Sequence, residues 1–277
     1  MNEPHPIVDL HVHLFPERMF EAIWAFFKDW DWGVHREQVD AVAATLAGHG
    51  VTLATGLSYA HRPGVAGPLN EFMAAIGERH SMFRPFASVH VDDEDLKALV
   101  DRALDSPHLH GFKFQPLVQE YDLADPRLDY LYERCLERDF PILMHAGTGP
   151  IPNAYLGFEH FSRVLARFPE LRLCVAHMGA FEYDAFLEAL DDHPGLYLDT
   201  TMINTRTDLF DTTWRGDEQR LRRHADRICF GSDWPNVPYA YQEALDSLLR
   251  FPLPAEALPG LRGGNALRFL KLTDGQA

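Results

Sequence analysis

Short apolar runs alternate with amphipathic segments along the whole chain. Eight runs rich in apolar and β-branched residues recur about every thirty residues, at 6–12, 51–57, 83–91, 110–115, 140–147, 171–179, 195–202 and 227–234. Between them apolar residues return every three or four positions, as in 36–50, 68–80, 93–104, 126–138, 158–169 and 240–251. Such spacing is typical of amphipathic helices. The pattern therefore predicts eight strands that alternate with helices.

The predicted strands are apolar on both faces, as expected for parallel strands that are covered on each side. Eight right-handed βα units close naturally into a barrel. The main alternative is an open doubly wound sheet, which normally carries a glycine-rich phosphate loop after its first strand. Residues 11–17, HVHLFPE, contain no glycine. We therefore predict an α/β fold, a somewhat distorted (β/α)8 TIM barrel that forms a single domain over residues 1–277.

Three segments depart from the simple repeat. Residues 20–33, FEAIWAFFKDWDWG, are strongly aromatic. We expect them to pack as core beneath an extra helix; the alternative is a lid or a subunit contact, which would predict a homodimer. Residues 204–220 form a long connection after the seventh predicted strand. The C-terminal GGNALRFL, residues 263–270, predicts a final helix packed against the barrel.

Composition narrows the class of protein. A length of 277 residues suits one α/β barrel, and 46% hydrophobic residues suffice for a full core. The absence of any run of about 18 apolar residues argues against a membrane span. A formal net charge of −16 disfavours nucleic acid and anionic membranes as partners. The start lacks the features of a secretory signal, and Cys135, Cys174 and Cys229 are odd in number and widely spaced. We therefore expect reduced thiols and a cytoplasmic location.

Polar residues fall at the ends of several predicted strands. His11 and His13 end the first, His145 the fifth, His177 the sixth and Asp233 the eighth. In a closed barrel these carboxyl ends meet at one mouth, where barrel enzymes place their active sites. Imidazole and carboxylate ligands suit zinc, and catalytic sites keep one position open. Each residue alone has an ordinary structural explanation, but their joint pattern predicts a metal site.

The motifs that carry these residues also resemble a known family. DLHVHLFP, GFKFQP, PILMHAG, VAHMG, FGSDWP and GGNALRFL occur in this order between residues 7 and 271. The order resembles the amidohydrolase superfamily, and most closely its amidohydrolase-related branch, which includes aminocarboxymuconate-semialdehyde decarboxylase, resorcylate decarboxylases and pyrone-dicarboxylate lactonase. The resemblance implies a metal-dependent (β/α)8 enzyme, usually with one zinc ion.

The resemblance also implies roles for individual residues. The metal ligands would be His11, His13, His145 and Asp233. His177 would face the reacting water or substrate, or ligate a second metal as in binuclear relatives. In those relatives a lysine at the position of Lys113 is carboxylated and bridges two metals. We instead predict that Lys113 binds an anionic substrate or pairs with a carboxylate.

Two further acidic residues lie close to the predicted ligands in sequence. Asp9 either accepts the outer N–H of a ligand histidine and fixes its tautomer, or bonds to backbone at the barrel floor. Asp199 ends the seventh predicted strand in YLDTT. We expect it to support a ligand or to contact the substrate.

The predicted activity is hydrolysis of a small, carboxylate-bearing amide, ester or lactone. Asp233 would accept a proton from water, and His177 would orient that water or donate a proton. Arg62 and Arg206 follow predicted strands and could clamp a carboxylate, although each has a surface ion pair as its simpler explanation. Asn204 would line the mouth with them. The alternatives are a metal-dependent decarboxylase or lyase of a small aromatic or unsaturated acid, and a catalytically inactive metal-binding barrel.

Overall fold

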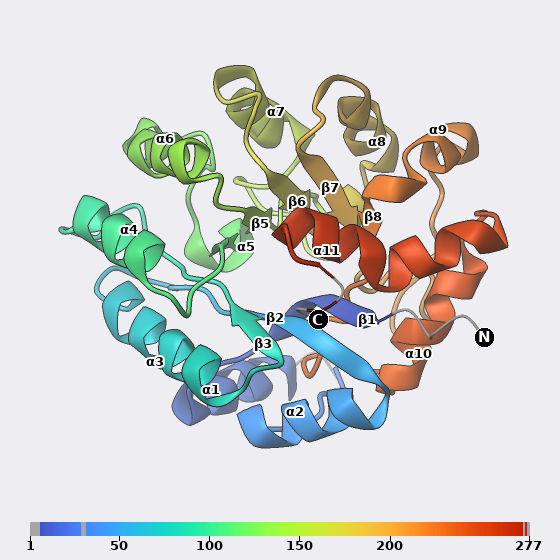
Figure 1. Ribbon diagram of the computed structural model, residues 1–277, viewed down its shortest axis with the longest axis horizontal. Coiled ribbons are helices and arrows are strands. Elements are labelled where there is room, and N and C mark those ends of the chain that lie inside the picture. The colour runs from blue at the N-terminus through green and yellow to red at the C-terminus, as the bar shows by residue number, and fades with distance from the viewer. Residues whose placement is uncertain (1–5, 29–31, 274, 276–277) are drawn as a thin grey trace.

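The computed structural model describes residues 6–28, 32–273 and 275. A ring of helices surrounds the strands (Figure 1). The strands are β1 (Ile7–His13), β2 (Val51–Leu57), β3 (Phe83–Pro85), β4 (Phe112–Phe114), β5 (Ile142–Met144), β6 (Leu173–Val175), β7 (Leu196–Asp199) and β8 (Ile228–Cys229). The α-helices are α1 (Glu17–Lys28), α2 (Val39–Gly48), α3 (Ala66–Arg79), α4 (Leu96–Asp105), α5 (Pro116–Gln119), α6 (Asp129–Arg138), α7 (Phe158–Arg167), α8 (Tyr183–Asp192), α9 (Glu218–Arg223), α10 (Tyr241–Ser247) and α11 (Asn265–Leu270).

The strands close into a parallel barrel in chain order. β1 to β3 form one hydrogen-bonded sheet and β4 to β8 another, and every ladder within them is parallel. Single bridges join the two sheets at both seams, Ala87 to Phe112 and Val12 to Trp234. At the second seam the backbone N–H of His13 also donates to the carbonyl of Trp234 over 2.7 Å. The predicted (β/α)8 barrel is confirmed.

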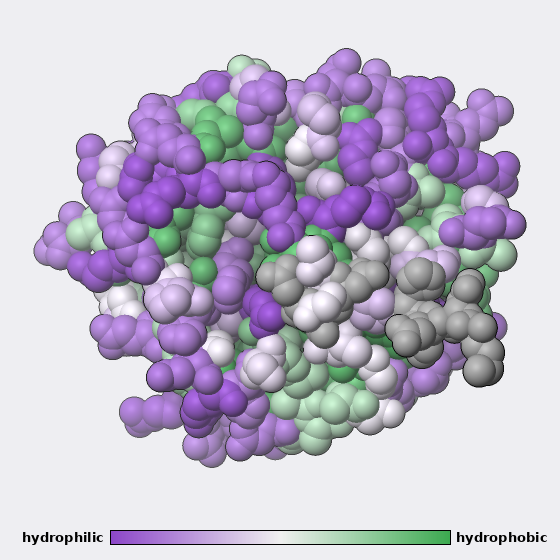
Figure 2. Space-filling view, viewed as in Figure 1, coloured by the Kyte–Doolittle hydropathy of each residue, from purple (hydrophilic) through white to green (hydrophobic). Residues whose placement is uncertain are grey.

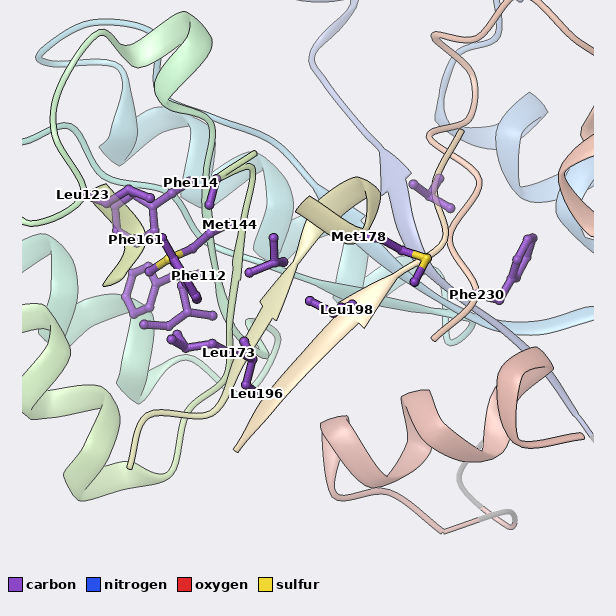
Figure 3. Packing of buried hydrophobic residues seen from close by; sticks show 14 of the residues in the cluster. Phe112, Phe114, Leu123, Met144, Phe161, Leu173, Met178, Leu196, Leu198 and Phe230 are labelled. Atoms are coloured by element: carbon purple, nitrogen blue, oxygen red, sulfur yellow. The ribbon is translucent and has the colours of Figure 1, made fainter. Parts of the chain in front are cut away.

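Alternation along the short strands separates two packing layers. Phe112, Phe114 and Met144 belong to the large cluster that also contains Phe161 of α7, as the close-up shows (Figure 3). Leu143, one residue before Met144, belongs instead to the smaller cluster that also holds side chains of α11. Because side chains alternate across a strand, each strand sends one set to the helices and the other into the barrel.

The last helix closes the amino ends of the strands. A π-helical turn, Gly260–Gly264, precedes α11, and a Cβ atom on Gly263 would lie 2.2 Å from the carbonyl oxygen of Pro6. Only glycine permits this close approach. The Asn265 side chain donates to the carbonyls of Ala225 and Ile228, which fixes the start of α11. The predicted final helix is confirmed, and Figure 1 shows it lying across one end of the barrel.

The aromatic segment after β1 contributes mainly to the core. In α1, Phe20 and Trp24 are buried, while Phe26 is 55% exposed. Residues 29–31 lie outside the described residues. Beyond them Trp32 stacks on Phe210, with 5.1 Å between ring centroids, and its Nε1 donates to the carbonyl of Asn236. The core interpretation accounts for the inner face of α1, and a homodimer stays a prediction.

The surface agrees with the acidic, polar composition. Hydrophilic side chains cover most of the face seen in Figure 2. Cys135, Cys174 and Cys229 are buried and free of disulfides, as the sequence predicts. Among the helices of the described residues, none combines the length and apolar character that crossing a bilayer requires.

Candidate metal centre

Two histidines of β1 meet a carboxylate that follows β8. His11, His13 and Asp233 offer ligand atoms that all lie within 4.8 Å of one another. The Asp233 Oδ1 atom is 2.8 Å from His13 Nε2 and 3.4 Å from His11 Nε2. Asp233 adopts a left-handed backbone with φ 65°, and its N–H donates to the carbonyl of His11 over 2.8 Å. The seam between β1 and β8 therefore sets the position of all three side chains.

The outer nitrogen of each β1 imidazole is held by an acceptor. His11 Nδ1 lies 2.9 Å from Asp199 Oδ2, and His13 Nδ1 lies 3.3 Å from the carbonyl of Leu57. Because these oxygens accept, Nδ1 of each ring carries the proton and Nε2 presents a lone pair. Both lone pairs then face the Asp233 carboxylate. This arrangement of acceptors is stable only with a proton or a cation between them.

The other two predicted histidines extend the same cluster. The ring of His177 lies 5.5 Å from that of His11 and 4.7 Å from that of His145, measured between centroids. His177 Nδ1 donates to the carbonyl of Thr201 over 3.1 Å, and His145 Nε2 donates to the carbonyl of Gly149 over 3.0 Å. Nδ1 of His145 is buried and has no hydrogen-bond partner within the part of the chain that the structure describes.

The charges and lone pairs of this cluster fit a divalent cation. Burial and the positive charge of Lys113 hold the pKa of His11 well below its usual range. Burial, followed by the neighbouring His177 and Lys113, does the same for His145. Although burial opposes it, the neighbouring His13, His11 and His177 hold the pKa of Asp233 well below its usual range. His11 and His145 as neutral imidazoles, beside an ionised Asp233, are in the protonation states that metal ligands require.

Lys113 lies beneath the cluster, inside the barrel. Its Nζ atom is 3.5 Å from His11 Nε2, and the side chain is fully buried. Burial lowers the pKa of Lys113 to about 8, although the charges of Asp199 and Asp233 oppose the shift. Among the described residues Lys113 forms no ion pair with a carboxylate, so its predicted pairing or substrate contact stays a prediction.

The two acidic residues near the ligands have different roles. Asp9 Oδ1 accepts the backbone N–H groups of His11 and Ser232, each over 3.0 Å, and Oδ2 accepts the Tyr241 hydroxyl over 2.8 Å. Of the two interpretations for Asp9, the backbone one is therefore correct. Burial raises the pKa of Asp9 to about 7, against these hydrogen bonds. Asp199, and not Asp9, accepts the outer N–H of a candidate ligand.

The structure does not bring the predicted substrate residues into this cluster. The side chains of Arg62 and Arg206 are exposed, and Arg206 lines a wide outer groove between residues 205–213 and Pro238. Asn204 Oδ1 accepts the backbone N–H of Trp214 over 2.9 Å, so its side chain is occupied in holding a loop. The sequence placed these residues on the correct loops, but it could not show where their side chains point.

A narrow pocket beside His177 was missed by the sequence reasoning. It is lined by Gly149, Pro150, His177, Ala180, Phe181, Tyr183, Met202, Ile203, Phe210, Asp211 and Thr212. These residues come from the segments after β5, β6 and β7, and Tyr183 is the first residue of α8. Because irregular loops carry no hydrophobic period, no sequence pattern marks them as a pocket. Among these lining residues only Asp211 and, when protonated, His177 can carry a charge, so the walls are mostly apolar.

A glycine allows two of these loops to approach each other. Gly147 follows His145, and a Cβ atom there would lie 2.4 Å from the carbonyl carbon of Gly179. Gly179 itself has φ 70° and follows His177 by two residues. The loops that carry His145 and His177 are therefore held in direct backbone contact, which brings the two rings together.

Comparison with known proteins identifies the class of this chain. The family model described as amidohydrolase matches residues 8–272, so the chain belongs to the amidohydrolase family and is an enzyme of that superfamily. This family is metal-dependent and acts on small molecules, and the predicted membership is confirmed. Among curated proteins, none matches the sequence.

Solved structures show the same fold at low sequence identity. An uncharacterized TIM-barrel protein from Bordetella bronchiseptica has a TM-score of 0.73 and 20% identity, over 96% of this chain and 98% of that one. The 5-carboxyvanillate decarboxylase of Sphingomonas paucimobilis has a TM-score of 0.70 and 14% identity, over 97% and 100%. An amidohydrolase from Burkholderia multivorans with bound zinc has a TM-score of 0.66 and 17% identity, over 97% and 100%.

Proposed function

We propose that this enzyme is a zinc-dependent hydrolase of a small, carboxylate-bearing amide, ester or lactone. One observation carries the proposal. His11 and His13 each have an outer N–H held by an acceptor, so their inner lone pairs converge on the Asp233 carboxylate. In a protein, such a set of acceptors is the usual cage of a catalytic zinc ion. A zinc-bound neighbour with the same fold supports this choice of metal.

The proposed ligands are His11, His13, His145 and Asp233. His145 belongs to the set because its buried Nδ1 atom has no partner and its Nε2 proton is already donated. A divalent metal held there would supply Lewis acidity toward a carbonyl oxygen and toward water. Asp233 would also accept the proton of the attacking water. His177 would hold that water or the carbonyl oxygen through Nε2, because its Nδ1 is bonded to Thr201.

We propose a single metal and an unmodified Lys113. The Nζ atom of Lys113 lies 3.5 Å from the inner nitrogen of His11, beneath the ligands. An ammonium there would attract the negative charge that develops on the substrate. A carboxylated lysine would add about 44 Da for each chain, so the intact mass of the purified protein, measured in neutral, non-denaturing buffer that preserves the acid-labile carbamate, distinguishes the two states. A mass increase of about 44 Da that is lost in Lys113→Met would instead favour the binuclear alternative.

The substrate would lie in the mostly apolar pocket beside His177, whose volume of about 20 Å³ would have to widen through movement of its loops. Phe181, Met202 and Phe210 would contact its carbon skeleton. The outer groove shares Phe210, Asp211 and Thr212 with this pocket and contains Arg206, which would meet an anionic end of the substrate. We propose that Arg62 and Asn204 also contact the substrate, which would require movement of their loops.

Decarboxylation of a small aromatic or unsaturated acid is the second candidate function. The apolar lining of the pocket suits a flat carbon skeleton, and a carboxyvanillate decarboxylase shares the fold. The same ligands would then hold the carboxylate of the substrate, and a side chain at the mouth would deliver a proton to carbon.

A panel assay tests these proposals. The zinc-loaded protein is offered lactones, amides, esters and aromatic acids, and zinc content is measured for each variant. We expect turnover in one class, and loss of both zinc and turnover in His11→Ala and Asp233→Ala. His80→Ala is the control, because His80 follows α3 at the amino end of the barrel and pairs with the exposed Asp40. Stoichiometric zinc in His11→Ala would contradict the ligand assignment.

A further inference from the structure

Buried polar atoms without partners gather at one end of the barrel. In the described part of the chain, most buried side-chain nitrogen and oxygen atoms that lack a hydrogen bond follow the carboxyl ends of strands. They belong to Ser58, Gln115, His145, Thr200, Thr201 and Asn236. Folded proteins seldom leave such atoms unpaired without a ligand or water to satisfy them. Their concentration after the carboxyl ends of the strands indicates that this end of the barrel is built to hold a polar molecule.

Within this group, Gln115 is the residue whose side-chain orientation follows from its place in the fold. Lys113 points into the barrel, where it meets His11, whereas Phe114 points outward to the rings of Tyr121 and Tyr132. Gln115 directly follows the extended residues of β4, and the ladder with β5 continues up to it, since the backbone N–H of His145 donates to the carbonyl of Phe114. Because side chains alternate along an extended chain, Gln115 lies on the same inner face as Lys113, one step nearer the mouth.

The strand register places Gln115 beside a proposed metal ligand. Lys113 pairs with Leu143, and Phe114 with Met144. The backbone N–H of His145 donates to the carbonyl of Phe114 over 3.0 Å, so the ladder continues past the last paired residues. Gln115 and His145 are therefore neighbours across β4 and β5. Each carries a buried atom with no partner, Oε1 of Gln115 and Nδ1 of His145.

The backbone of Gln115 is fixed independently of its side chain. Its N–H donates to Gln119 Oε1 over 2.7 Å, and Gln119 Nε2 donates to the carbonyls of Ala60 and Val89. These bonds tie the end of β4 to the loops after β2 and β3. The backbone at Gln115 is thus held at the mouth, while its side-chain oxygen has no partner among the described residues. A fixed backbone limits the positions that a side chain can take before binding, which lowers the cost of a substrate contact.

We propose that Gln115 accepts a hydrogen bond from a hydroxyl or N–H group of the substrate, next to the substrate oxygen that binds the metal. The inference deepens the proposed function and rests on it. Its consequence is selectivity. A buried acceptor left unpaired penalises any analogue that lacks the donor, so Gln115 would select acids, esters or amides that carry one.

Binding of inert probes tests the proposal without requiring turnover. Benzoate, 2-hydroxybenzoate and 3-hydroxybenzoate are titrated into the zinc-loaded protein and followed by calorimetry. The variants are Gln115→Met, which removes the acceptor, and Gln115→Glu, which keeps one. The control is Gln242→Met, because Gln242 is exposed and bonded only to Asp246 in the described structure. Gln115→Asn, which withdraws the same oxygen, replaces Gln115→Met if that variant does not fold.

We expect the unaltered protein to bind at least one hydroxybenzoate about tenfold more tightly than benzoate. Gln115→Met should bind all three probes equally while keeping its zinc, and Gln115→Glu and Gln242→Met should keep the preference. The proposal is overturned if Gln115→Met keeps the preference, or if the unaltered protein shows none. If the preference for a hydroxybenzoate depends on Gln115 but no panel compound is turned over, the contact made by Gln115 stands and only the proposed hydrolysis is rejected.

Discussion

The buried pair of Asp199 and His11 gives the most detailed prediction. Asp199 Oδ2 accepts His11 Nδ1 over 2.9 Å, while Oδ1 accepts the backbone N–H groups of His177 and Thr201 over 2.9 and 3.1 Å. Asp199→Asn keeps one acceptor oxygen but replaces the other with a donor. If the oxygen stays on the two backbone groups, the new N–H faces His11 Nδ1. The imidazole proton must then move to Nε2, which removes the inner lone pair.

The expected loss can be stated as an affinity. Carboxylates that orient a metal-bound histidine typically contribute 10- to 100-fold to metal affinity. Asp199→Asn should therefore weaken zinc binding by roughly 10- to 100-fold, which corresponds to about 1.4–2.7 kcal/mol. Competition against a chromogenic chelator measures the dissociation constant, and circular dichroism confirms that the variant is folded.

A second histidine–aspartate pair provides a matched control. Asp191 Oδ1, on α8, lies 2.7 Å from Nε2 of His224, which directly follows α9, and this pair does not include the proposed metal ligands. Asp191→Asn should leave the zinc affinity unchanged. The reasoning fails if Asp199→Asn changes the affinity by less than about twofold, or if both variants lose zinc equally.

Three other predictions test separate parts of the account. His177→Asn should keep stoichiometric zinc but lower kcat by roughly 100-fold, the usual scale for an acid–base group, and parallel loss of zinc would contradict this. Gly147→Ala should weaken zinc binding, because the new Cβ atom would meet the backbone of Gly179. Gly33→Ala is the control, because open space surrounds Gly33, and it should leave zinc binding unchanged. Equal zinc affinities of the two variants would refute the claim. Phe161→Ala should lower the free energy of unfolding by about 3–5 kcal/mol in urea titrations, and a loss below about 1 kcal/mol would show that the cluster around α7 is not close-packed.

Hydrophobic periodicity carried most of the information about the fold. All eight predicted strands are present, because each is an apolar run bounded by turn residues. The predicted run at 83–91 was too long, since β3 covers only Phe83–Pro85 and a single bridge follows at Ala87. Beyond it, the backbone N–H of His90 donates to Asp93 Oδ2 in a turn. Residues 85–91 are buried both in the strand and past its end, so the composition of the run could not show where pairing ends.

The candidate site was predictable only where strands position it. His11, His13, His145 and His177 lie together because strand ends converge in any closed barrel. Pairing between side chains was not predictable, as the contrast between Asp9 and Asp199 shows. Asp9 is two residues from His11 in sequence, yet the carboxylate that contacts the His11 ring comes from β7. Such contacts depend on register around the barrel, which one sequence does not specify.

The most direct test of the central claim is a zinc-soaked crystal examined by anomalous scattering. The account predicts one zinc ion per chain, within about 2.0–2.2 Å of Nε2 of His11 and His13, Nδ1 of His145 and a carboxylate oxygen of Asp233. An ion bound elsewhere, or one that leaves the two β1 histidines without contact to it, would contradict the account.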